Sequence, residues 1–408
     1  MERLVQNSKR KKAAKLPAFT RYLFETIDWN QRLILILGHR GTGKTTLMLQ
    51  RMQQLEGKSI FLSLDDYFFE EVRLATFVEQ LYTQGVRTFF LDEAHRYLNW
   101  SSDLKILVDA YSDASFVVSG SSVLALEKGK ADLSRRAAVY HLEGLSFREF
   151  LNLELGTNFP KYSLNEILTQ HSNLAEPLVD QEDNILSHFE KYLEYGYYPF
   201  YRESKVLYPT RLLEITNLVL EIDLAPFEEL SYKTVRSMKK LLYILSESVP
   251  FIPNISKLAE RLDTSRNTVL KTVDLLEQAK LLLLLRQQTQ GVSFLQKPEK
   301  IYLQNPNLAF AFSNQVPNRG NLRETFFFNQ LQVQHEVSLP KQSDFMLDHS
   351  YVIEVGGAHK GNQQLVGIPN AFVAADGIKT GSGNKIPLWL FGFLYWNKHQ
   401  RTVQEFLG

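Results

Sequence analysis

Short apolar runs alternate with stretches of mixed polarity along the first 142 residues. The runs are rich in β-branched and aromatic residues, which favour strands. Most stretches between them have apolar residues three or four positions apart, as in Leu104, Leu107 and Val108, which is the spacing of a helix. This alternation predicts an α/β fold in which helices wrap a parallel sheet. The predicted strands are residues 32–37, 59–64, 87–91, 115–119 and 137–142.

The pattern changes in the rest of the chain. Residues 151–233 have helical spacing and many aromatic side chains, without a strong strand signal. Two short amphipathic helices, separated by a turn at Asp263 and Thr264, then precede a strand, which is the outline of a winged helix. The remaining residues mix strands with a helix over 321–334 and a glycine-rich stretch over 376–384. We predict five parts: a basic tail (1–16), an α/β core (17–150), a helical segment (151–233), a winged helix (234–292) and a C-terminal α/β domain (293–408).

Composition limits the class of protein. The 408 residues exceed what one hydrophobic core usually serves, which predicts roughly two to four domains. With 46 basic and 45 acidic residues the net charge is +1, so no overall field attracts nucleic acid or an anionic membrane. The absence of cysteine excludes disulfides, thiolate nucleophiles and cysteine-rich metal sites, and it fits a reducing cytoplasm.

Neither end of the chain has the pattern of a membrane segment. The first residues are basic but lack an apolar core of signal-peptide length. The longest apolar stretch, residues 386–396, is about half of a membrane span and predicts a buried strand or two. We therefore expect a cytoplasmic protein without a membrane partner.

The most informative stretch is Gly38-His-Arg-Gly-Thr-Gly-Lys-Thr45, which follows a predicted strand and precedes a helical run over 46–55. Its glycines allow backbone N–H groups to turn inward around phosphate oxygens, and the helix adds the positive end of its dipole. Lys44 is placed to reach the β- and γ-phosphates of ATP, and the Thr45 hydroxyl to bind Mg²⁺. A glycine-rich turn without a ligand is the alternative. We expect nucleotide contacts from Gly38, His39, Arg40, Gly41, Thr42, Gly43, Lys44, Thr45 and Thr46.

The stretch Arg87-Thr-Phe-Phe-Leu-Asp-Glu-Ala-His95 supplies the acidic partners that such a loop needs. Its strand delivers Asp92 and Glu93 at the carboxyl end, where ligands bind in open α/β sheets. We expect Asp92 to hold Mg²⁺ through water and Glu93 to polarise the attacking water. A solvated turn is the structural alternative.

Two further pairs of residues are candidates for catalysis. Ser119 and Ser121 follow the strand at 115–119 and are placed to contact the γ-phosphate or the attacking water, although a serine-rich turn that caps the next helix explains them equally well. Arg135 and Arg136 are candidate transition-state arginines that act within the chain or on a neighbouring subunit. Paired surface charges are the alternative for these arginines.

A family resemblance extends the prediction to most of the chain. Five motifs occur in this order: the glycine-rich loop, Phe-Phe-Leu-Asp-Glu-Ala-His, Val-Val-Ser-Gly-Ser-Ser, the sequence from Arg135 to Leu151 and the aromatic stretch 192–201. With these motifs the chain resembles a large family of prokaryotic AAA-type ATPases. The resemblance implies a P-loop NTPase core with a helical lid over 151–233. It also implies a winged helix and a C-terminal domain similar to a restriction endonuclease, as well as ATP binding and hydrolysis.

The C-terminal domain departs from the nuclease pattern, which has a helix glutamate, an aspartate and a Glu-x-Lys strand that together hold Mg²⁺ and the attacking water. Here Glu324, Asp344 and Glu354 match the acids, but Gly356 stands at the lysine position. Lys360 lies beyond a glycine-rich turn, and we do not expect it to reach back. The resulting prediction is a degraded, inactive domain.

The winged helix leaves its partner open. Arg266, Asn267 and Lys271 lie at the start of its second helix, where DNA-binding proteins place basic and amide side chains. Several nearby acidic residues dilute this charge, and winged helices also bind proteins. The dilution comes from Glu260, Asp263, Asp274 and Glu277.

These observations favour an ATP-binding protein with Mg²⁺-dependent hydrolysis. We expect a slow switch whose nucleotide state repositions the winged-helix and C-terminal domains toward an unknown protein partner or DNA, with a homo-oligomer if the arginines act on a neighbour. One alternative is an ATP-regulated DNA-processing nuclease. Another is a DNA-binding regulator that senses ATP without hydrolysing it.

Overall fold

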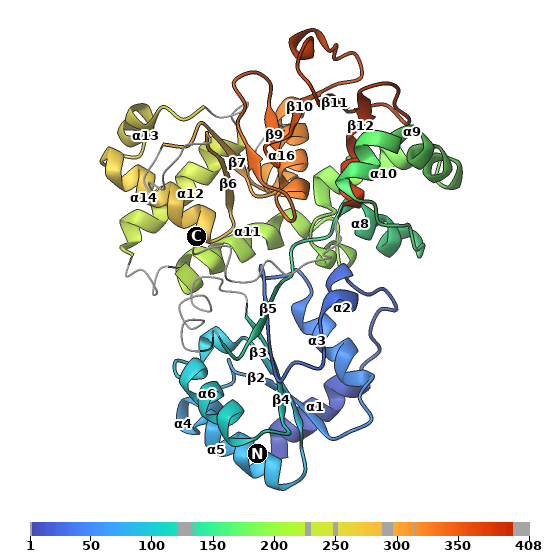
Figure 1. The fold of residues 1–408 in the computed structure, drawn as a ribbon. Coiled ribbons are helices and arrows are strands. Elements are labelled where there is room, and N and C mark those ends of the chain that lie inside the picture. The colour runs from blue at the N-terminus through green and yellow to red at the C-terminus, as the bar shows by residue number, and fades with distance from the viewer. Residues whose placement is uncertain are drawn as a thin grey trace. The chain divides into compact units, whose positions relative to one another are not determined.

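The computed structural model describes residues 2–120, 133, 135–224, 230–247, 252–287, 297–313 and 315–394 (Figure 1). The chain forms two compact units. The first unit contains Met1–Gly144 and Ile222–Glu228, and the second contains Leu145–Glu221 and Glu229–Gly408. The chain therefore leaves the first unit after Gly144 and returns to it for a short segment that begins at Ile222.

A parallel five-stranded sheet forms the centre of the first unit. The strands are β1 (Leu33–Leu37), β2 (Ser59–Ser63), β3 (Thr88–Asp92), β4 (Ser115–Gly120) and β5 (Ala138–His141), in the order β2-β3-β4-β1-β5. Every residue of β1 is buried, as expected for a strand that helices cover on both faces. The predicted α/β fold is confirmed, and each predicted strand bound lies within one residue of the observed one.

The helices of this unit pack on both sides of the sheet. In Figure 1, α5 and α6 lie on one side, whereas α1 and α3 lie on the other. Apolar residues from β1, β2, β3, α5 and α6 meet in one core cluster. The helices are α1 (Glu2–Ala13), α2 (Tyr22–Thr26), α3 (Lys44–Gln53), α4 (Phe68–Glu71), α5 (Leu74–Thr83), the 3₁₀ turn η1 (Ala94–Arg96) and α6 (Trp100–Ala110).

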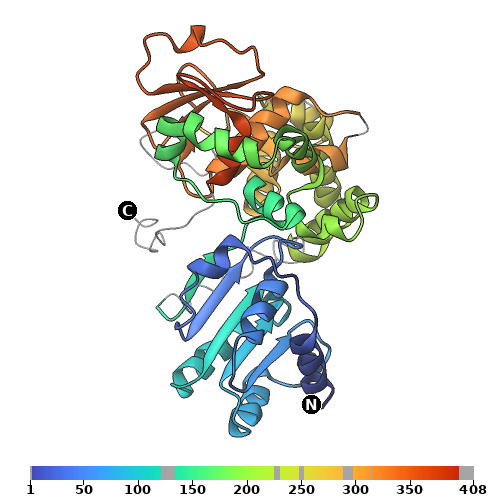
Figure 2. The same cartoon turned by 90° about the vertical axis from the view of Figure 1, so that its right-hand side faces the viewer.

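The basic tail predicted over residues 1–16 is largely a packed helix, although Lys9 and Arg10 are exposed as expected. These residues begin with α1, which packs against β2 and α3 (Figure 2, dark blue). Leu4 and Ser8 are buried, and the Ser8 hydroxyl accepts a hydrogen bond of 2.8 Å from the backbone N–H of Phe61. Because β2 is an edge strand, this contact satisfies one of its otherwise unpaired donors. The Lys11 ammonium lies over the ring of Phe61 in β2. This lysine was expected to be solvated, but it packs on the edge strand of the sheet.

The second unit begins with helices that surround an aromatic core. The rings of Phe147, Phe189, Tyr192 and Phe326 contact one another. Ser146 and Glu149 form a capping box that starts the first helix. The elements are α8 (Phe147–Leu155), α9 (Leu164–Gln181), α10 (Ile185–Tyr195), η2 (Pro199–Arg202), α11 (Tyr208–Leu218) and the π-helical η3 (Val219–Leu224), whose last three residues belong to the first unit.

Three helices and two strands follow in the region of the predicted winged helix. α12 (Tyr232–Ser246), α13 (Ile255–Arg261) and α14 (Arg266–Gln278) precede the antiparallel pair of β6 (Leu282–Leu285) and β7 (Lys300–Leu303). Ser265 caps α14, because its side chain accepts a hydrogen bond from the backbone N–H of Thr268. The predicted domain boundary at residue 292 falls between two paired strands, because β7 belongs with β6 and not with the C-terminal sheet.

A mixed sheet forms the last part of the second unit. The strands are β8 (Val337–Ser338), β9 (Phe345–Leu347), β10 (Tyr351–Gly356), β11 (Ala371–Ala375) and β12 (Lys385–Pro387), in the order β12-β11-β10-β9-β8. α16 (Arg319–Leu331) packs against β10, and the remaining elements are α15 (Pro306–Phe312), η4 (Gln363–Leu365) and η5 (Leu388–Phe393). The stretch predicted as one or two strands near 386–396 is mostly the 3₁₀ helix η5. Across the described ranges, we find no helix with the length and apolarity of a membrane span.

Candidate nucleotide-binding site

The glycine-rich loop connects the end of β1 to the start of α3 and depends on its glycines. Gly41 and Gly43 have φ angles of 80° and 97°, in the left-handed region that disfavours side chains. A Cβ atom on Gly38 would lie 2.2 Å from the carbonyl oxygen of Leu142, the residue after β5. The loop can therefore keep this conformation only with glycine at these positions.

A buried arginine fixes the loop from outside. Arg21 donates through Nη1 to the carbonyl of Thr42 in the loop, and through Nη2 to the carbonyls of Glu143 and Gly144, each at 2.8 Å. Arg21 is 5% exposed, so these charge-assisted hydrogen bonds satisfy a desolvated guanidinium. Arg21 was not predicted for the site, because nothing in its local pattern relates it to a loop that starts 17 residues later.

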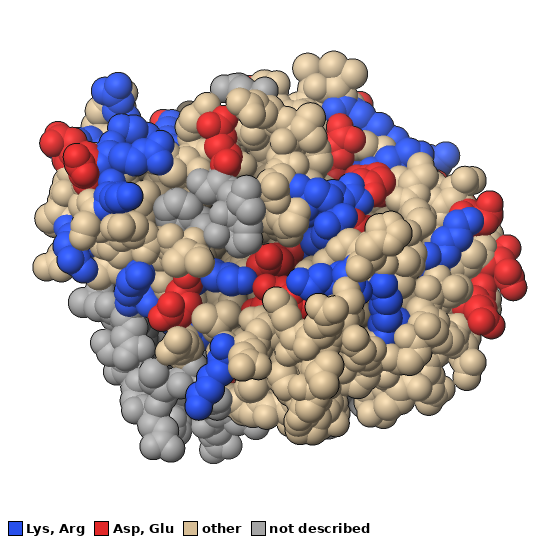
Figure 3. Space-filling view, turned by 90° about the horizontal axis from the view of Figure 1, so that it is seen from above, with Lys and Arg blue, Asp and Glu red and all other residues tan. Residues whose placement is uncertain are grey.

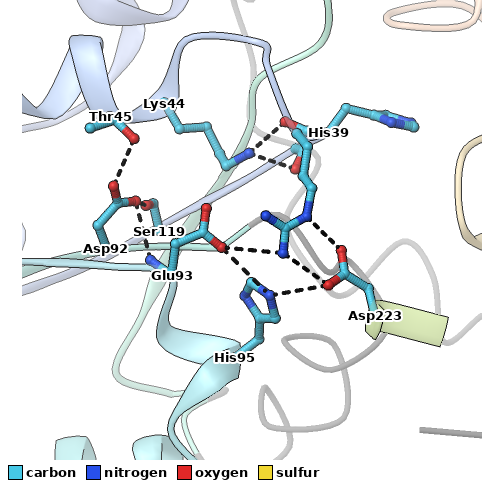
Figure 4. Close-up of polar contacts among 10 residues, drawn as sticks. His39, Lys44, Thr45, Asp92, Glu93, His95, Ser119 and Asp223 are labelled. Carbon is cyan, nitrogen blue, oxygen red and sulfur yellow. Dashed lines mark hydrogen bonds and ion pairs between the residues drawn. The ribbon is translucent and has the colours of Figure 1, made fainter. Parts of the chain in front are cut away.

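Lys44 points back onto its own loop. Its ammonium donates to the carbonyls of Gly38 at 2.8 Å and His39 at 2.6 Å (Figure 4). Burial lowers the pKa of Lys44 to about 8, although the nearby Glu93 and Asp92 carboxylates act in the opposite direction. A buried ammonium with two neutral acceptors is poised to gain a stronger, anionic partner.

Asp92 lies at the centre of a hydrogen-bond cluster at the carboxyl edge of the sheet (Figure 4). The Thr45 hydroxyl donates to Oδ2 at 2.7 Å, and the buried Ser119 hydroxyl donates to Oδ1. The backbone N–H of Glu93 donates to Oδ1 at 3.2 Å. The predicted pair Thr45 and Asp92 is thus brought together. Ser119 contacts Asp92, and Ser121 lies outside the described residues.

Glu93 has a strained backbone. Its φ and ψ angles of 54° and 39° are left-handed, which is rare for a residue with a side chain and common at functional sites. Its side chain is 21% exposed, and Oε2 lies 3.8 Å from Nη2 of Arg40 and 3.5 Å from Nε2 of His95. The carboxylate is therefore accessible and has two basic side chains beside it.

Asp223 completes the site from a distant part of the chain. Its two oxygens each accept a hydrogen bond of 3.0 Å from Arg40, and Oδ1 lies 3.6 Å from Nε2 of His95. Burial raises the pKa of Asp223, but the contacts with His95 and Arg40 outweigh it and lower the pKa to about 2. Neither residue was predicted for the site. Asp223 lies 183 residues after Arg40, and His95, although it is two residues after Glu93, was not singled out in that stretch.

This geometry agrees with the comparison to known protein families. Residues 30–151 match the family model of an AAA domain. Because of this similarity, we refer to the segment as the AAA domain. Its parallel sheet, with the glycine-rich loop after β1 and an acidic pair after β3, has the P-loop NTPase fold, which binds nucleotides. Residues 186–319 match a domain of unknown function, DUF8612.

Similar proteins share more than the AAA domain. An uncharacterized protein of Methanocaldococcus jannaschii is 26% identical over 397 residues, which cover 87% of this chain and 82% of that protein. An uncharacterized protein of Haemophilus influenzae is 24% identical over 317 residues, 73% of each chain. The structure of the Walker-type ATPase PABY2304 of Pyrococcus abyssi aligns over 74% of this chain and 99% of its own, with 12% identity and a TM-score of 0.41.

The two predicted transition-state arginines lie at the opposite edge of the AAA domain's sheet. Ala138, two residues after Arg136, pairs with Ile34 near the start of β1, whereas the glycine-rich loop follows the end of β1. This register places the start of β5 about 13 Å from the loop along the strand direction, and the arginines lie in the turn before it. Arg136 forms an ion pair of 2.8 Å with Asp109, and Arg135 is exposed. The prediction that they act on the nucleotide of their own chain is therefore wrong, and action on a neighbour stays a prediction.

The predicted nuclease carboxylates are close to lysines. Lys300 donates to Glu324 and to Asp344, each at 3.1 Å. Lys360 forms an ion pair of 2.5 Å with Glu354, contrary to our expectation that it does not reach back. Gly356 explains this contact, because a Cβ atom there would lie 2.6 Å from Cβ and Cγ of Lys360. The glycine thus makes room for the lysine.

The residues predicted to contact DNA lie at the surface of the second unit. Arg266, Asn267 and Lys271 are exposed at the start of α14, so their contact with DNA stays a prediction. Figure 3 shows basic and acidic side chains interspersed over the face that it presents. Within the described ranges, no group of three or more histidine, aspartate or glutamate residues is arranged to hold a metal ion.

Proposed function

We propose that the AAA domain binds Mg²⁺ and ATP and hydrolyses the ATP slowly. The observation that carries this proposal is the cluster at the carboxyl edge of the sheet, where Lys44, Thr45, Asp92 and Glu93 meet. A buried lysine, a hydroxyl next to a carboxylate and a second carboxylate in a strained conformation are the groups that phosphoryl transfer to water needs. Mg²⁺-dependent phosphate release from ATP by the purified protein tests it.

Each side chain has a separate part in this reaction. Lys44 binds the β- and γ-phosphates, and the inward N–H groups of the loop bind phosphate oxygens. The Thr45 hydroxyl and the Asp92 carboxylate lie 2.7 Å apart, so the hydroxyl can bind a magnesium ion directly and the carboxylate through water, with Ser119 orienting Asp92. Mg²⁺ neutralises charge on the phosphates when it is bound. Glu93 accepts the proton of the attacking water.

We infer that the nucleotide state acts as a switch for the second unit. The chain enters that unit at Leu145 and returns at Ile222 to place Asp223 beside the glycine-rich loop. Both connections therefore start next to the nucleotide site. An ATPase tied in this way to domains with exposed polar surfaces suits slow turnover and a change of partner binding, with protein or DNA as the partner.

Action of Arg135 on a neighbouring subunit predicts a dependence on protein concentration. We expect the specific ATPase activity to rise with concentration, because an arginine at the amino edge of the sheet can contact only another subunit's nucleotide. Mixing inactive Lys44→Ala subunits with Arg135→Ala subunits should restore activity. Turnover that is independent of concentration, with no recovery on mixing, would remove Arg135 from catalysis.

The C-terminal domain is expected not to cleave DNA. Lys300 neutralises Glu324 and Asp344 at the place where a nuclease would hold its cation, so metal binding has to displace a partly buried ammonium. Supercoiled plasmid incubated with the protein and Mg²⁺ or Mn²⁺, with and without ATP, should stay intact. The control is the double variant Asp344→Ala/Glu354→Ala. Nicking by the wild type that the double variant loses would support a nuclease, with Lys360 as its lysine.

A further inference from the structure

An ion pair with little exposure joins Arg40 of the glycine-rich loop to Asp223. Arg40 belongs to the loop, and its side chain is 17% exposed, whereas that of Asp223 is 3% exposed. Taking both charges out of water costs free energy that the attraction between them barely offsets, so a buried pair is weak evidence for stability. A role in nucleotide binding gives this pair a reason to exist.

The geometry of the pair resembles that of an arginine bound to phosphate. Nε and Nη2 of Arg40 each donate to a different oxygen of Asp223 at 3.0 Å, and the same two-pronged geometry suits phosphate oxygens. The low pKa of Asp223 agrees with a fully ionised carboxylate. Asp223 thus offers Arg40 the charge and the paired oxygens of a phosphate group.

The position of Arg40 relates the pair to the γ-phosphate. Nη2 lies 3.8 Å from Oε2 of Glu93, the carboxylate that in the proposed function activates the attacking water. That water has to lie between Glu93 and the γ-phosphate, so the guanidinium is within reach of the same phosphate by a change of side-chain torsion angles. A triphosphate at this place would also repel the Asp223 carboxylate.

We propose that Asp223 holds the place of the γ-phosphate for Arg40 in the nucleotide-free protein. ATP takes over the guanidinium, and Asp223, with the π-helical segment Val219–Leu224, is released from the loop. ADP lacks the γ-phosphate and leaves the pair intact. Arg40 then has two roles: it contacts the terminal phosphate, and it reports ATP to the segment through which the chain returns from the second unit. This inference rests on the proposed function.

Amide hydrogen exchange in residues 219–224 tests whether ATP replaces Asp223 as the partner of Arg40. Amide exchange in a peptide covering residues 219–224 is measured in the full-length protein without nucleotide, with Mg²⁺ and ADP, and with Mg²⁺ and a non-hydrolysable ATP analogue. We expect the analogue to increase exchange severalfold and ADP to leave it unchanged, because only the analogue breaks the pair with Asp223.

Two variants identify the residues responsible. Asp223→Asn keeps the shape of the side chain but removes its charge, so exchange should be high without nucleotide, and the preference for the analogue over ADP should rise about tenfold. Arg40→Ala should bind the analogue and ADP with similar affinities. Asp109→Asn is the control, because Asp109 accepts two hydrogen bonds from Arg136 in a more exposed ion pair away from the site, and it should behave as the wild type.

The outcomes separate this inference from the proposed function. Binding of both nucleotides without a difference in exchange at residues 219–224, or the same behaviour of Asp223→Asn and Asp109→Asn, would overturn the role of the pair and leave the ATPase proposal standing. Failure of the wild-type protein to bind either nucleotide would overturn both.

Discussion

Lys44→Ala is expected to weaken ATP binding by about 3–4 kcal/mol, which is about 10²–10³ in Kd. The substitution removes a buried ammonium that already holds the centre of the loop through Gly38 and His39. The phosphates of ATP would replace these neutral partners by charged ones, and such hydrogen bonds are among the strongest in proteins. Titration of ATP in the presence of Mg²⁺, by calorimetry or with a fluorescent analogue, measures the loss.

The control for this titration is Lys58→Ala, which removes an exposed lysine of the same unit. Its affinity for ATP should equal that of the wild type. Because Lys44 is buried and its loss leaves two carbonyls without a donor, the folding of the variants has to be checked. Circular dichroism should show that both variants are folded. Wild-type affinity in folded Lys44→Ala protein would mean that the loop is not the nucleotide site.

Glu93→Gln is expected to keep ATP binding and to reduce turnover by a factor on the order of 10² or more. The amide preserves the size of the side chain, but it cannot accept a proton from water. Its backbone can keep the left-handed conformation of Glu93, because the two residues have the same branching. Initial rates of phosphate release, together with the affinity for ATP, separate binding from chemistry.

A second carboxylate of the same domain provides the comparison. Glu71→Gln removes an exposed charge at the end of α4, and it should turn over at the wild-type rate. Equal rates for Glu93→Gln and the wild type would remove Glu93 from the mechanism. A large loss of ATP affinity in Glu93→Gln would instead show that the carboxylate supports the loop, for example through Arg40.

The positions of site residues that the sequence predicts follow from short-range patterns. The loop, its helix and the carboxylates after β3 are each contained within about a dozen residues, and parallel strands bring their carboxyl ends to one edge of a sheet. For this reason Thr45 and Asp92, 47 residues apart, could be expected to meet, and the structure joins them. The spacing of residues along the chain could not show that the Ser119 hydroxyl donates a hydrogen bond to Asp92.

The sequence-based predictions for the arginines and for Asp223 failed for two different reasons. The positions of Arg135 and Arg136 could have been predicted, because residues that precede a parallel strand lie at its amino edge, away from the loop. Asp223 could not have been predicted, since it meets Arg40 across 183 residues of chain. Such a contact depends on how the second unit returns the chain to the first, and no local pattern records that path.

The amino-terminal and carboxyl-terminal errors both concern lysines. A run of basic residues usually indicates solvent exposure, but α1 buries only Leu4 and Ser8, so its apolar signal is weaker than its charge. Lys360 reaches Glu354 because Gly356 carries no side chain in its path. A glycine at a position where a motif has lysine therefore need not mean that the positive charge is missing from the site.

Single-turnover release of phosphate from ATP tests the proposed reaction most directly. Wild-type protein in excess over γ-labelled ATP should convert all of the label to phosphate when Mg²⁺ is present, and chelation of Mg²⁺ should stop the conversion. Under the same conditions Glu93→Gln should bind the nucleotide and leave it intact. ATP that stays bound and unhydrolysed by the wild type, or phosphate release that is equally fast in Glu93→Gln, would contradict hydrolysis at this site.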